Sequence, residues 1–327
     1  MVPSWAGRCT KGPSVIPELP EVETVRRELA SWLPGRTVLE AERMDAPAGP
    51  KYAGLERLPG QRIEAVQRRG KFLLLPLVHM PADARRAQGG SARQDGHSEA
   101  KGDELVVHLG MTGVVRRTPP PGHLRVRLRL SGPAPSDLYF QDVRRFGRFT
   151  VVPAGDYRHL PTLAALGPDA LDPAFTTEGF RRALARSGVA IKTLLLSQRV
   201  VAGVGNIYAD EALWRVGVHP LRPARQLRRA QVVALHGALL EVLEASLALQ
   251  GTTLYDYRTV NGEVGAFLQE LAVYGHAGEP CRRCGTRLER LVVGQRGTHV
   301  CPRCQPAPRR ASRRVTRRAP RRTRRAA

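Results

Sequence analysis

Four of the five cysteines stand in two pairs whose spacing suits a metal ion. Cys281 and Cys284 form one Cys-x-x-Cys pair, and Cys301 and Cys304 form the second after sixteen intervening residues. Four thiolates at this spacing can surround one Zn²⁺ as a closed tetrahedron between two tight turns, so the ion would be structural and not catalytic. Disulfides or an iron–sulfur cluster are the alternatives. Free thiolates would agree with a reducing compartment, so we expect a cytoplasmic protein.

An excess of positive charge points to nucleic acid as the partner. The 327 residues include 52 Lys and Arg against 29 Asp and Glu, a formal charge of +23. Ten arginines lie in residues 305–327, and without them the chain still carries +13. Cationic side chains gain affinity for a polyphosphate by releasing its condensed counterions. A basic protein from an arginine-rich proteome is the alternative interpretation.

The first element that could position reactive groups is a helix near the start of the chain. Val22, Val25, Leu29 and Leu33 recur at spacings of three and four, which predicts one buried face of a helix over residues 17–33. Prolines in its first turn cost little, because the first amide groups of a helix have no partner within it.

Residues 36–152 predict β-structure, because short apolar or alternating runs such as Phe72–Leu77 and Glu104–His108 are separated by Gly and Pro. In Leu124–Leu130 every second residue is Arg, so one face should be buried and the other cationic. Several such strands in succession favour a sandwich. The polar stretch 81–103 predicts a long mobile loop between strands.

From about residue 160 the periodicity becomes helical. Helices are predicted over 177–186, 190–198, 206–216 and 225–249. The last is long and amphipathic, through Val232, Val233, Leu235, Leu239, Leu240 and Leu243. Residues 250–276 predict a functional loop, and the tail after 305 lacks apolar residues to form a core. No run approaches the roughly 18 apolar residues of a membrane helix, and no secretory signal is evident.

Six motifs follow one another within residues 17–305. They are PELPEVET, RRGKFLLL, HLGMTG, QDVRRFGR, VAGVGNIYADEALW and the cysteine module EPCRRCGTRLERLVVGQRGTHVCPRCQ. In this order they resemble the formamidopyrimidine-DNA glycosylase family. The resemblance implies an α+β multidomain protein. Its parts would be an N-terminal extension 1–16, a β-sandwich domain with a leading helix 17–152, a helix–two-turn–helix domain with a lesion-capping loop 160–276, a zinc finger 277–305 and a disordered Arg-rich tail 306–327.

The resemblance also implies a reaction, the excision of oxidised purines (8-oxoguanine and formamidopyrimidines) from duplex DNA followed by strand cleavage. Pro17 would be the nucleophile, because an N-terminal amine titrates near 8 and keeps a neutral fraction. Glu18 and Glu21 would be acid/base carboxylates, and Lys71 and Arg296 would bind phosphates near the lesion. Taken alone, the proline would be a helix-start residue, and the two acids would complement the helix dipole.

The sequence departs from the family pattern at this nucleophile. Pro17 follows Ile16, and a proline nitrogen inside a chain is an amide without a lone pair to offer. We therefore expect residues 1–16 to be absent from the mature enzyme.

Further DNA contacts follow from the resemblance. Met111, Arg144 and Phe146 would fill the space left by the flipped base and hold the orphaned cytosine, for which a guanidinium is a suitable donor. The remaining predicted contacts are those of His108, Lys192, Asn206 and Tyr274. Taken alone, Met111 and Phe146 would be core residues and Asn206 a helix cap.

Two other functions stay open at this point. An endonuclease VIII-type glycosylase would prefer oxidised pyrimidines, although that group usually opens PEGPE whereas this chain has PELPE. A non-catalytic binder of damaged DNA would fit a blocked Pro17. Under the enzymatic reading, we expect a monomer that acts on damaged double-stranded DNA and makes no membrane contact.

Overall fold

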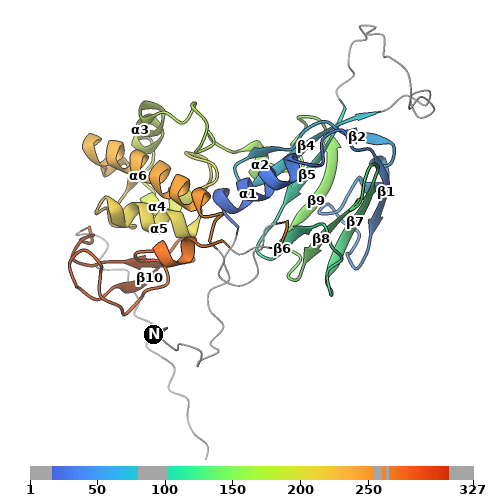
Figure 1. The fold of residues 1–327 in the computed structure, drawn as a ribbon. Helices are drawn as coiled ribbons and strands as arrows, with labels where there is room; N and C mark the ends of the chain where they lie inside the picture. The colour runs from blue at the N-terminus through green and yellow to red at the C-terminus, as the bar shows by residue number, and fades with distance from the viewer. Residues whose placement is uncertain (1–16, 80–101, 253–259, 263–264, 309–327) are drawn as a thin grey trace, which may run out of the picture. The chain divides into compact units, whose positions relative to one another are not determined.

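The structure is a computed structural model that describes residues 17–79, 102–252, 260–262 and 265–308 (Figure 1). The predicted N-terminal extension and nearly all of the 81–103 insertion and the Arg-rich tail lie outside the described residues. The chain forms two compact units. The first comprises the residues up to Phe175 with Gln198–Gly205 and Leu240–Glu270, and the second comprises Thr176–Ser197, Asn206–Leu239 and the residues from Leu271.

The first unit opens with helix α1 (Leu19–Ala30), as the apolar spacing predicted. Its residues Val22, Val25 and Leu29 are buried, and Pro20 lies in the first turn where no amide hydrogen is needed. The helix packs against the sandwich that follows it, and its N-terminal turn carries the two acidic residues that the sequence singled out.

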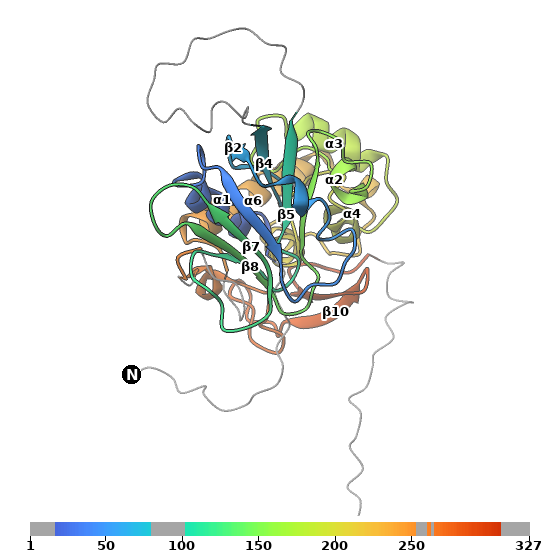
Figure 2. The same cartoon turned by 90° about the vertical axis from the view of Figure 1, so that its right-hand side faces the viewer.

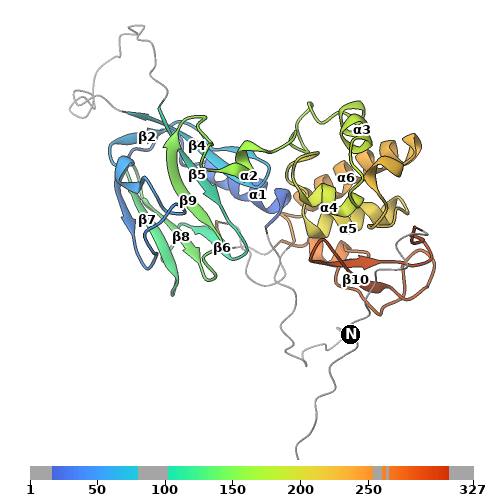
Figure 3. The same cartoon turned by 180° about the vertical axis from the view of Figure 1, so that it is seen from behind.

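The predicted sandwich is confirmed, and its two antiparallel sheets can be followed in Figures 2 and 3. One sheet has the strand order β1-β7-β8-β6 and the other β2-β4-β5-β9, with β3 paired to β4. The strands are β1 (Val38–Arg43), β2 (Gln61–Ile63), β3 (Gln67–Arg69), β4 (Phe72–His79), β5 (Asp103–His108), β6 (Gly113–Arg116), β7 (Leu124–Leu130), β8 (Asp137–Asp142) and β9 (Arg148–Pro153). A short 3-10 helix η1 (Leu55–Arg57) precedes β2.

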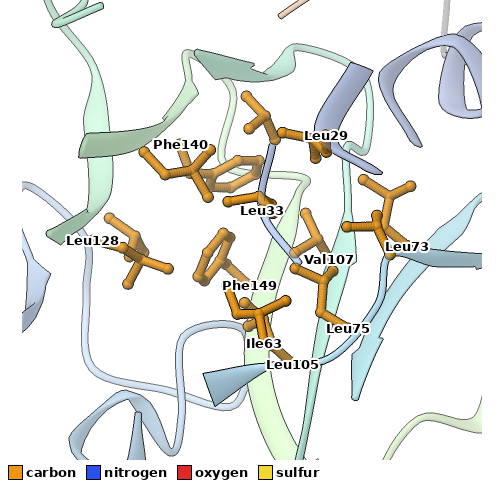
Figure 4. Close-up of a cluster of buried hydrophobic side chains, with 14 of the residues drawn as sticks. Leu29, Leu33, Ile63, Leu73, Leu75, Leu105, Val107, Leu128, Phe140 and Phe149 are labelled. Atoms are coloured by element: carbon orange, nitrogen blue, oxygen red, sulfur yellow. The ribbon is translucent and has the colours of Figure 1, made fainter. Parts of the chain in front are cut away.

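Side chains from α1 and both sheets fill the space between the layers (Figure 4). Leu75 and Leu105 come from one sheet, and Leu128 and Phe140 come from the other. Phe140 and Phe149 meet with their ring centroids 5.5 Å apart. This core fixes the ends of the strands, and the loops with the predicted DNA contacts start from those ends.

One expectation for β7 is wrong, because its arginines do not share an exposed face. The pairing with β8 shifts register between Leu124 and Val126, and Arg125 is consequently only 1% exposed. Its guanidinium binds the Asp45 carboxylate at 2.5 Å, and its Nε donates to the Asp142 carbonyl at 2.8 Å. Burying a guanidinium is tolerable only when its hydrogen bonds are satisfied in this way.

All four predicted helices are present, with small shifts at their ends. They are α3 (Thr177–Ala185), α4 (Ile191–Leu196), α5 (Asn206–Arg215) and α6 (Arg229–Ala248), while the start predicted for the last is a separate 3-10 turn, η3 (Ala224–Gln226). The other elements are α2 (Pro161–Ala164), η4 (Phe267–Glu270) and the hairpin of β10 (Glu289–Val293) with β11 (Arg296–Val300).

Helix α6 departs from the sequence interpretation at one residue of its apolar face. By length and apolar composition alone, it is also the one described helix long enough to cross a membrane. However, Leu235, Leu239 and Leu243 are fully buried in the protein, as is usual for a core helix. Val233, predicted on the apolar face, is instead 52% exposed.

Candidate active site and DNA interface

The start of α1 gathers buried acidic groups beside Pro17. Pro17, Glu18 and Glu21 are all buried, and Glu21 is completely inaccessible. The Glu21 carboxylate accepts the Glu18 amide hydrogen at 2.8 Å and the Thr252 amide hydrogen at 2.7 Å. Because its oxygens bind backbone groups, Glu21 fixes the start of the helix and the segment that contains Thr252.

Two glycines of the GVGN motif allow the chain to approach α1 closely. The Gly203 carbonyl accepts the Leu19 amide hydrogen at 3.1 Å, and a Cβ on Gly203 would overlap the Leu19 side chain. A Cβ on Gly205 would overlap the Glu18 carboxyl carbon and lie 2.5 Å from Lys71 Nζ. The Glu18 carboxyl group and the Lys71 ammonium group therefore lie together beside Gly205. The sequence reading did not single out these glycines, although the G-x-G spacing was a visible signal.

A network of charges supports the turn that presents Lys71 between β3 and β4. The Asp169 carboxylate accepts the Gly70 amide hydrogen at 2.7 Å and binds the Arg68 guanidinium at 2.5 and 2.9 Å. Arg68 also binds Glu23 of α1 at 2.9 Å. Burial raises the pKa of Glu23, but hydrogen bonds from Arg26 and Arg68 outweigh it and hold that pKa below its ordinary value. This network thus links α1 to the lysine turn.

His108 at the end of β5 is a neutral imidazole at physiological pH. Burial, followed by the charges of Lys71 and Arg148, lowers its pKa to about 4. Its Nδ1 accepts the Gly110 amide hydrogen at 3.1 Å, so the ring proton must reside on Nε2. The ring packs against Phe72 with centroids 4.6 Å apart. His108 can therefore donate one hydrogen bond to an anion but cannot neutralise its charge.

The three predicted void-filling residues lie on two adjoining loops and are not core residues. Phe146 is 50% exposed, and Arg144 is exposed with its guanidinium carbon 5.0 Å from the centre of the Phe146 ring. Met111 is half-buried in the loop between β5 and β6. A single exposed apolar side chain is common on protein surfaces, so the exposure of Phe146 shows only that it is not a core residue.

In the second unit, Lys192 does not lie where the predicted phosphate contact requires. Its side chain and that of Asp210 are both 0% exposed, and the two groups form an ion pair at 2.6 Å. The ammonium group also donates to Thr298 Oγ1 at 2.8 Å and to the Gly297 carbonyl at 3.2 Å. Since it cannot reach solvent in this structure, Lys192 holds α4, α5 and β11 together.

Asn206 is hydrogen-bonded to the residue that follows Arg296 in the chain. Asn206 is the first residue of α5, and its Nδ2 donates to the Gly297 carbonyl at 3.0 Å and to the Tyr274 hydroxyl at 3.4 Å. Arg296 immediately precedes Gly297 at the tip of the β10–β11 hairpin and is exposed. Tyr274 is buried and packs edge-on against His299 with ring centroids 4.9 Å apart.

Glu211 is a supporting residue that the sequence reading missed. It is 2% exposed on α5, and its carboxylate accepts the amide hydrogens of Ala272, Val273 and Tyr274 at 2.9–3.0 Å. It thereby fixes the backbone that carries Tyr274. The one feature of the sequence that could have indicated this role is an acidic residue among the apolar residues of the predicted helix.

The four paired cysteines form a centre that fits one structural zinc ion. Their sulfur atoms all lie within 4.8 Å of one another, with Cys284 and Cys301 sulfurs 3.5 Å apart. A tetrahedral zinc with bonds of about 2.3 Å separates its sulfur ligands by about 3.8 Å, whereas a disulfide requires about 2.05 Å. Hydrogen bonds from Thr286 lower the pKa of the Cys284 thiol to about 6, whereas burial raises the pKa values of Cys301 and Cys304, so the fit to zinc rests on the spacing of the sulfur atoms. The zinc prediction is confirmed over the disulfide alternative.

Three family models match the chain. They are the formamidopyrimidine-DNA glycosylase N-terminal domain over residues 16–149, the formamidopyrimidine-DNA glycosylase H2TH domain over 166–258, and the zinc finger found in FPG and IleRS over 278–307. Together they cover most of the chain and agree with the order of motifs in the sequence.

Curated relatives and solved structures agree with these matches. The formamidopyrimidine-DNA glycosylase of Thermus thermophilus is 47% identical over 292 residues, 89% of this chain and 98% of the relative, and that of Deinococcus radiodurans is 44% identical with the same coverage. The crystal structure of MutM (Fpg) from Thermus thermophilus matches with a TM-score of 0.76, 46% identity and coverage of 89% and 100%. A MutM complex with DNA containing carbocyclic 8-oxo-G matches with a TM-score of 0.73, 33% identity and the same coverage.

Proposed function

The chain belongs to the formamidopyrimidine-DNA glycosylase family, and on that premise we propose that it excises oxidised purines from duplex DNA and then cleaves the abasic strand. The observation that carries the proposal is the cluster at the head of α1, where the Glu18 carboxyl and the Lys71 ammonium meet beside Gly205. Such a pair can move a proton and bind a phosphate at neighbouring atoms. A solved relative bound to DNA with 8-oxo-G supports the substrate class.

Pro17 acts as the nucleophile once residues 1–16 have been removed. Its secondary amine attacks C1′ of the damaged nucleotide, the bond from C1′ to the base breaks, and the base departs with a proton. The bound amine then loses its proton, and its electron pair breaks the bond from C1′ to the ring oxygen O4′, which takes up a proton, so that an iminium ion joins Pro17 to the opened sugar. That cation accepts the electron pair released when C2′ loses a proton, so the 3′ phosphate leaves, and a second elimination releases the 5′ phosphate. In support, the N-terminal family model begins at residue 16.

Glu18 handles the protons of this reaction. Its carboxyl group adjoins the nucleophile in sequence and can protonate the sugar ring oxygen or the departing base. Lys71, presented by the supported turn after Gly70, binds a phosphate beside the lesion. His108 offers its Nε2 hydrogen as a neutral donor near Lys71, because its pKa of about 4 prevents protonation at physiological pH.

The trio of Met111, Arg144 and Phe146 fills the space in the DNA helix when the damaged base leaves it. Phe146 and Met111 supply apolar surface for unstacked neighbours, and Arg144 supplies donors to the orphaned cytosine. Extruding a base costs a few kcal/mol of stacking and pairing, so side chains that fill the void favour the extruded state.

The second unit binds the phosphate backbone. Arg296 makes one contact, and Asn206 makes another by exchanging its long bond to the Tyr274 hydroxyl for a phosphate oxygen. The buried Lys192 and the Glu211 carboxylate hold the segments on which those residues lie. Zinc, when bound, crosslinks the two ends of the finger and keeps the β10–β11 hairpin in one conformation. Within the cell we propose a cytoplasmic monomer that acts on chromosomal DNA.

Substrate preference tests the proposal against the endonuclease VIII-type alternative. The enzyme should excise 8-oxoguanine paired with cytosine much faster than thymine glycol in an otherwise identical duplex, measured as single-turnover rates. A faster rate on thymine glycol would favour the pyrimidine-specific alternative. Tight binding of both duplexes without excision of either would instead indicate a non-catalytic binder of damaged DNA.

A further inference from the structure

One buried carboxylate holds both loops that carry Met111, Arg144 and Phe146. Asp142 ends β8 and is 0% exposed. Its Oδ1 accepts the Thr112 hydroxyl hydrogen at 2.6 Å, and its Oδ2 accepts the Gly147 amide hydrogen at 2.7 Å. Thr112 follows Met111 on one loop, and Gly147 follows Phe146 on the other. A single charged group thus connects the residues adjacent to two of the three DNA-facing side chains.

The Thr112 hydroxyl extends this connection to the third side chain. Thr112 Oγ1 accepts the Arg144 amide hydrogen at 2.9 Å while its own hydrogen is donated to Asp142. Thr112 is only 4% exposed, so its hydroxyl is largely shielded from water and its bond to Asp142 is buried. The hydroxyl therefore acts as donor and acceptor at once, and a valine at this position could do neither.

Close backbone packing leaves these loops little freedom to move separately. Gly110 has a φ of +65°, and a Cβ there would lie 2.5 Å from the Gly147 amide nitrogen. Beneath them, Arg125 donates through Nε to the Asp142 carbonyl at 2.8 Å. The backbone of the two loops is therefore fixed, while Phe146 and Arg144 remain exposed.

Burying a carboxylate costs desolvation free energy unless the group is fully hydrogen-bonded, so a buried carboxylate at this position suggests a function. We propose that Thr112 and Asp142 are positioning residues for base extrusion, which hold Met111, Arg144 and Phe146 in the geometry that enters the DNA helix. The inference rests on the proposed function and extends it to two residues that never touch the substrate. Preorganisation of this kind lowers the barrier because the loops need not be ordered during extrusion.

The substitution Thr112→Val tests this inference with almost no change in volume. The matched control is Thr150→Val on β9, since Thr150 is 3% exposed and its hydroxyl donates to the Ala53 carbonyl, apart from both loops. Each zinc-loaded variant is assayed under single-turnover conditions on two duplexes. One contains 8-oxoguanine paired with cytosine, and the other contains a preformed abasic site, which has no base to extrude.

We expect Thr112→Val to slow excision of 8-oxoguanine about tenfold, because two hydrogen bonds to the loops are lost. Cleavage of the abasic site should change less than about twofold, since an unpaired position costs little to open. Thr112→Ser should restore excision because it keeps the hydroxyl. Asp142→Asn should shift the two activities in the same direction as Thr112→Val.

With 2-aminopurine placed beside the lesion, Thr112→Val should also reduce the fluorescence rise that accompanies unstacking.

The inference is overturned if Thr112→Val and Thr150→Val give the same ratio of the two activities, or if both activities fall together in Thr112→Val. Equal losses in Thr112→Ser and Thr112→Val would also overturn it, because the hydroxyl would then be irrelevant. If the unsubstituted enzyme neither excises 8-oxoguanine nor cleaves the abasic site, the proposed function itself fails, and this result is distinguishable from the others.

Discussion

The two compact units use buried charge in different ways. In the first, Arg68 and Asp169 are partly buried and support the turn of Lys71, whose own side chain is still accessible. In the second, Lys192 and Asp210 are completely buried, and Arg296 is an exposed cation on the adjoining hairpin. The comparison teaches that a cation within a functional motif can either touch the substrate or hold the residue that does.

The difference also follows the chemistry that each unit would perform. Proton transfer and covalent attack need groups placed within fractions of an ångström, so the first unit keeps its acids and lysine close to one another. Binding a phosphate backbone tolerates more variation, but it needs the hairpin and the helix start to hold their spacing. The second unit meets that need by fixing the Gly297 carbonyl from two sides, through Lys192 and Asn206.

The largest expected effect belongs to the proton-transfer group of the first unit. Glu18→Gln keeps the shape of the side chain but removes its ability to give or take a proton. The single-turnover excision rate should fall about 10²–10⁴-fold, the usual contribution of general acid–base catalysis. Thermal unfolding should report a folded protein. A rate within threefold of the unsubstituted enzyme would show that Glu18 does not transfer the proton.

A substitution in the buried ion pair of the second unit should lower the stability of the protein, whereas the substitution in the first unit lowers the excision rate. Lys192→Met leaves the Asp210 charge buried without its cation, and the free energy of unfolding should fall by about 3–5 kcal/mol. The matched control is Arg129→Met, which breaks an exposed pair with Glu40 and should cost less than about 1 kcal/mol. Denaturant titration measures both. If Lys192→Met instead weakened DNA binding at unchanged stability, Lys192 would be a phosphate ligand after all.

Crowding the junction between Glu18 and Lys71 should lower the rate without removing either group. Gly205→Ala introduces a Cβ that overlaps the Glu18 carboxyl group, and displacement of this size should reduce excision about 10²-fold. Gly122→Ala is the control, because its Cβ would meet open space. Comparable rates for the two variants would indicate that the close approach at Gly205 has no catalytic consequence.

Acid should destabilise both units, through one histidine in each. The pKa values of His108 and His219 are lowered to about 4, mainly by burial. The unfolded chain takes up these protons near pH 6.5, so the stability is complete above that pH and is lost as pH falls from 6.5 towards 4. At pH 5 the loss should be about 2 kcal/mol for the well-buried His219 and less for His108.

Urea titrations at pH 7.5 and pH 5 measure the difference in the free energy of unfolding. His219→Asn should reduce the pH dependence, because its amide oxygen can replace Nδ1 as acceptor of the Leu221 amide hydrogen. An unchanged dependence in this variant would show that His219 does not titrate as inferred.

The smallest effect is expected at the exposed end of the second unit. Arg296→Ala should weaken binding to damaged and undamaged duplexes alike and should reduce the slope of log affinity against log salt by about one. Arg181→Ala, which removes an arginine already paired with Glu178, is the control. Fluorescence anisotropy across a salt series measures the slope, and identical slopes for both variants would exclude a phosphate contact at Arg296.

Much of this account could be predicted from the sequence, because its signals are local. The start of α1, the strand Leu124–Leu130, the helix beginning at Asn206 and the four zinc ligands all follow from periodicity or spacing. From its apolar side chain alone, Phe146 would be predicted to lie in the core. Only the family resemblance predicted the exposed position that it has.

The supporting residues could not be predicted, because their partners are distant in the chain. Asp169 holds Gly70 from 99 residues away, and Glu211 holds Tyr274 from 63 residues away. Arg125 is buried because a register shift in β7 turns it inward, and periodicity cannot locate such a shift. The motif around Lys192 likewise could not distinguish a buried ion pair from a phosphate contact, because the partner Asp210 lies on another helix.

The proposed mechanism depends on the nitrogen of Pro17, freed from residues 1–16, bonding covalently to the damaged sugar. To test this directly, the enzyme is trapped on an 8-oxoguanine duplex with borohydride, and the crosslinked peptide is mapped by mass spectrometry. We expect the modified peptide to begin at Pro17 and to carry the reduced sugar on its nitrogen. An adduct on Lys71 or another lysine, or excision by protein in which Ile16 still precedes Pro17, would contradict it.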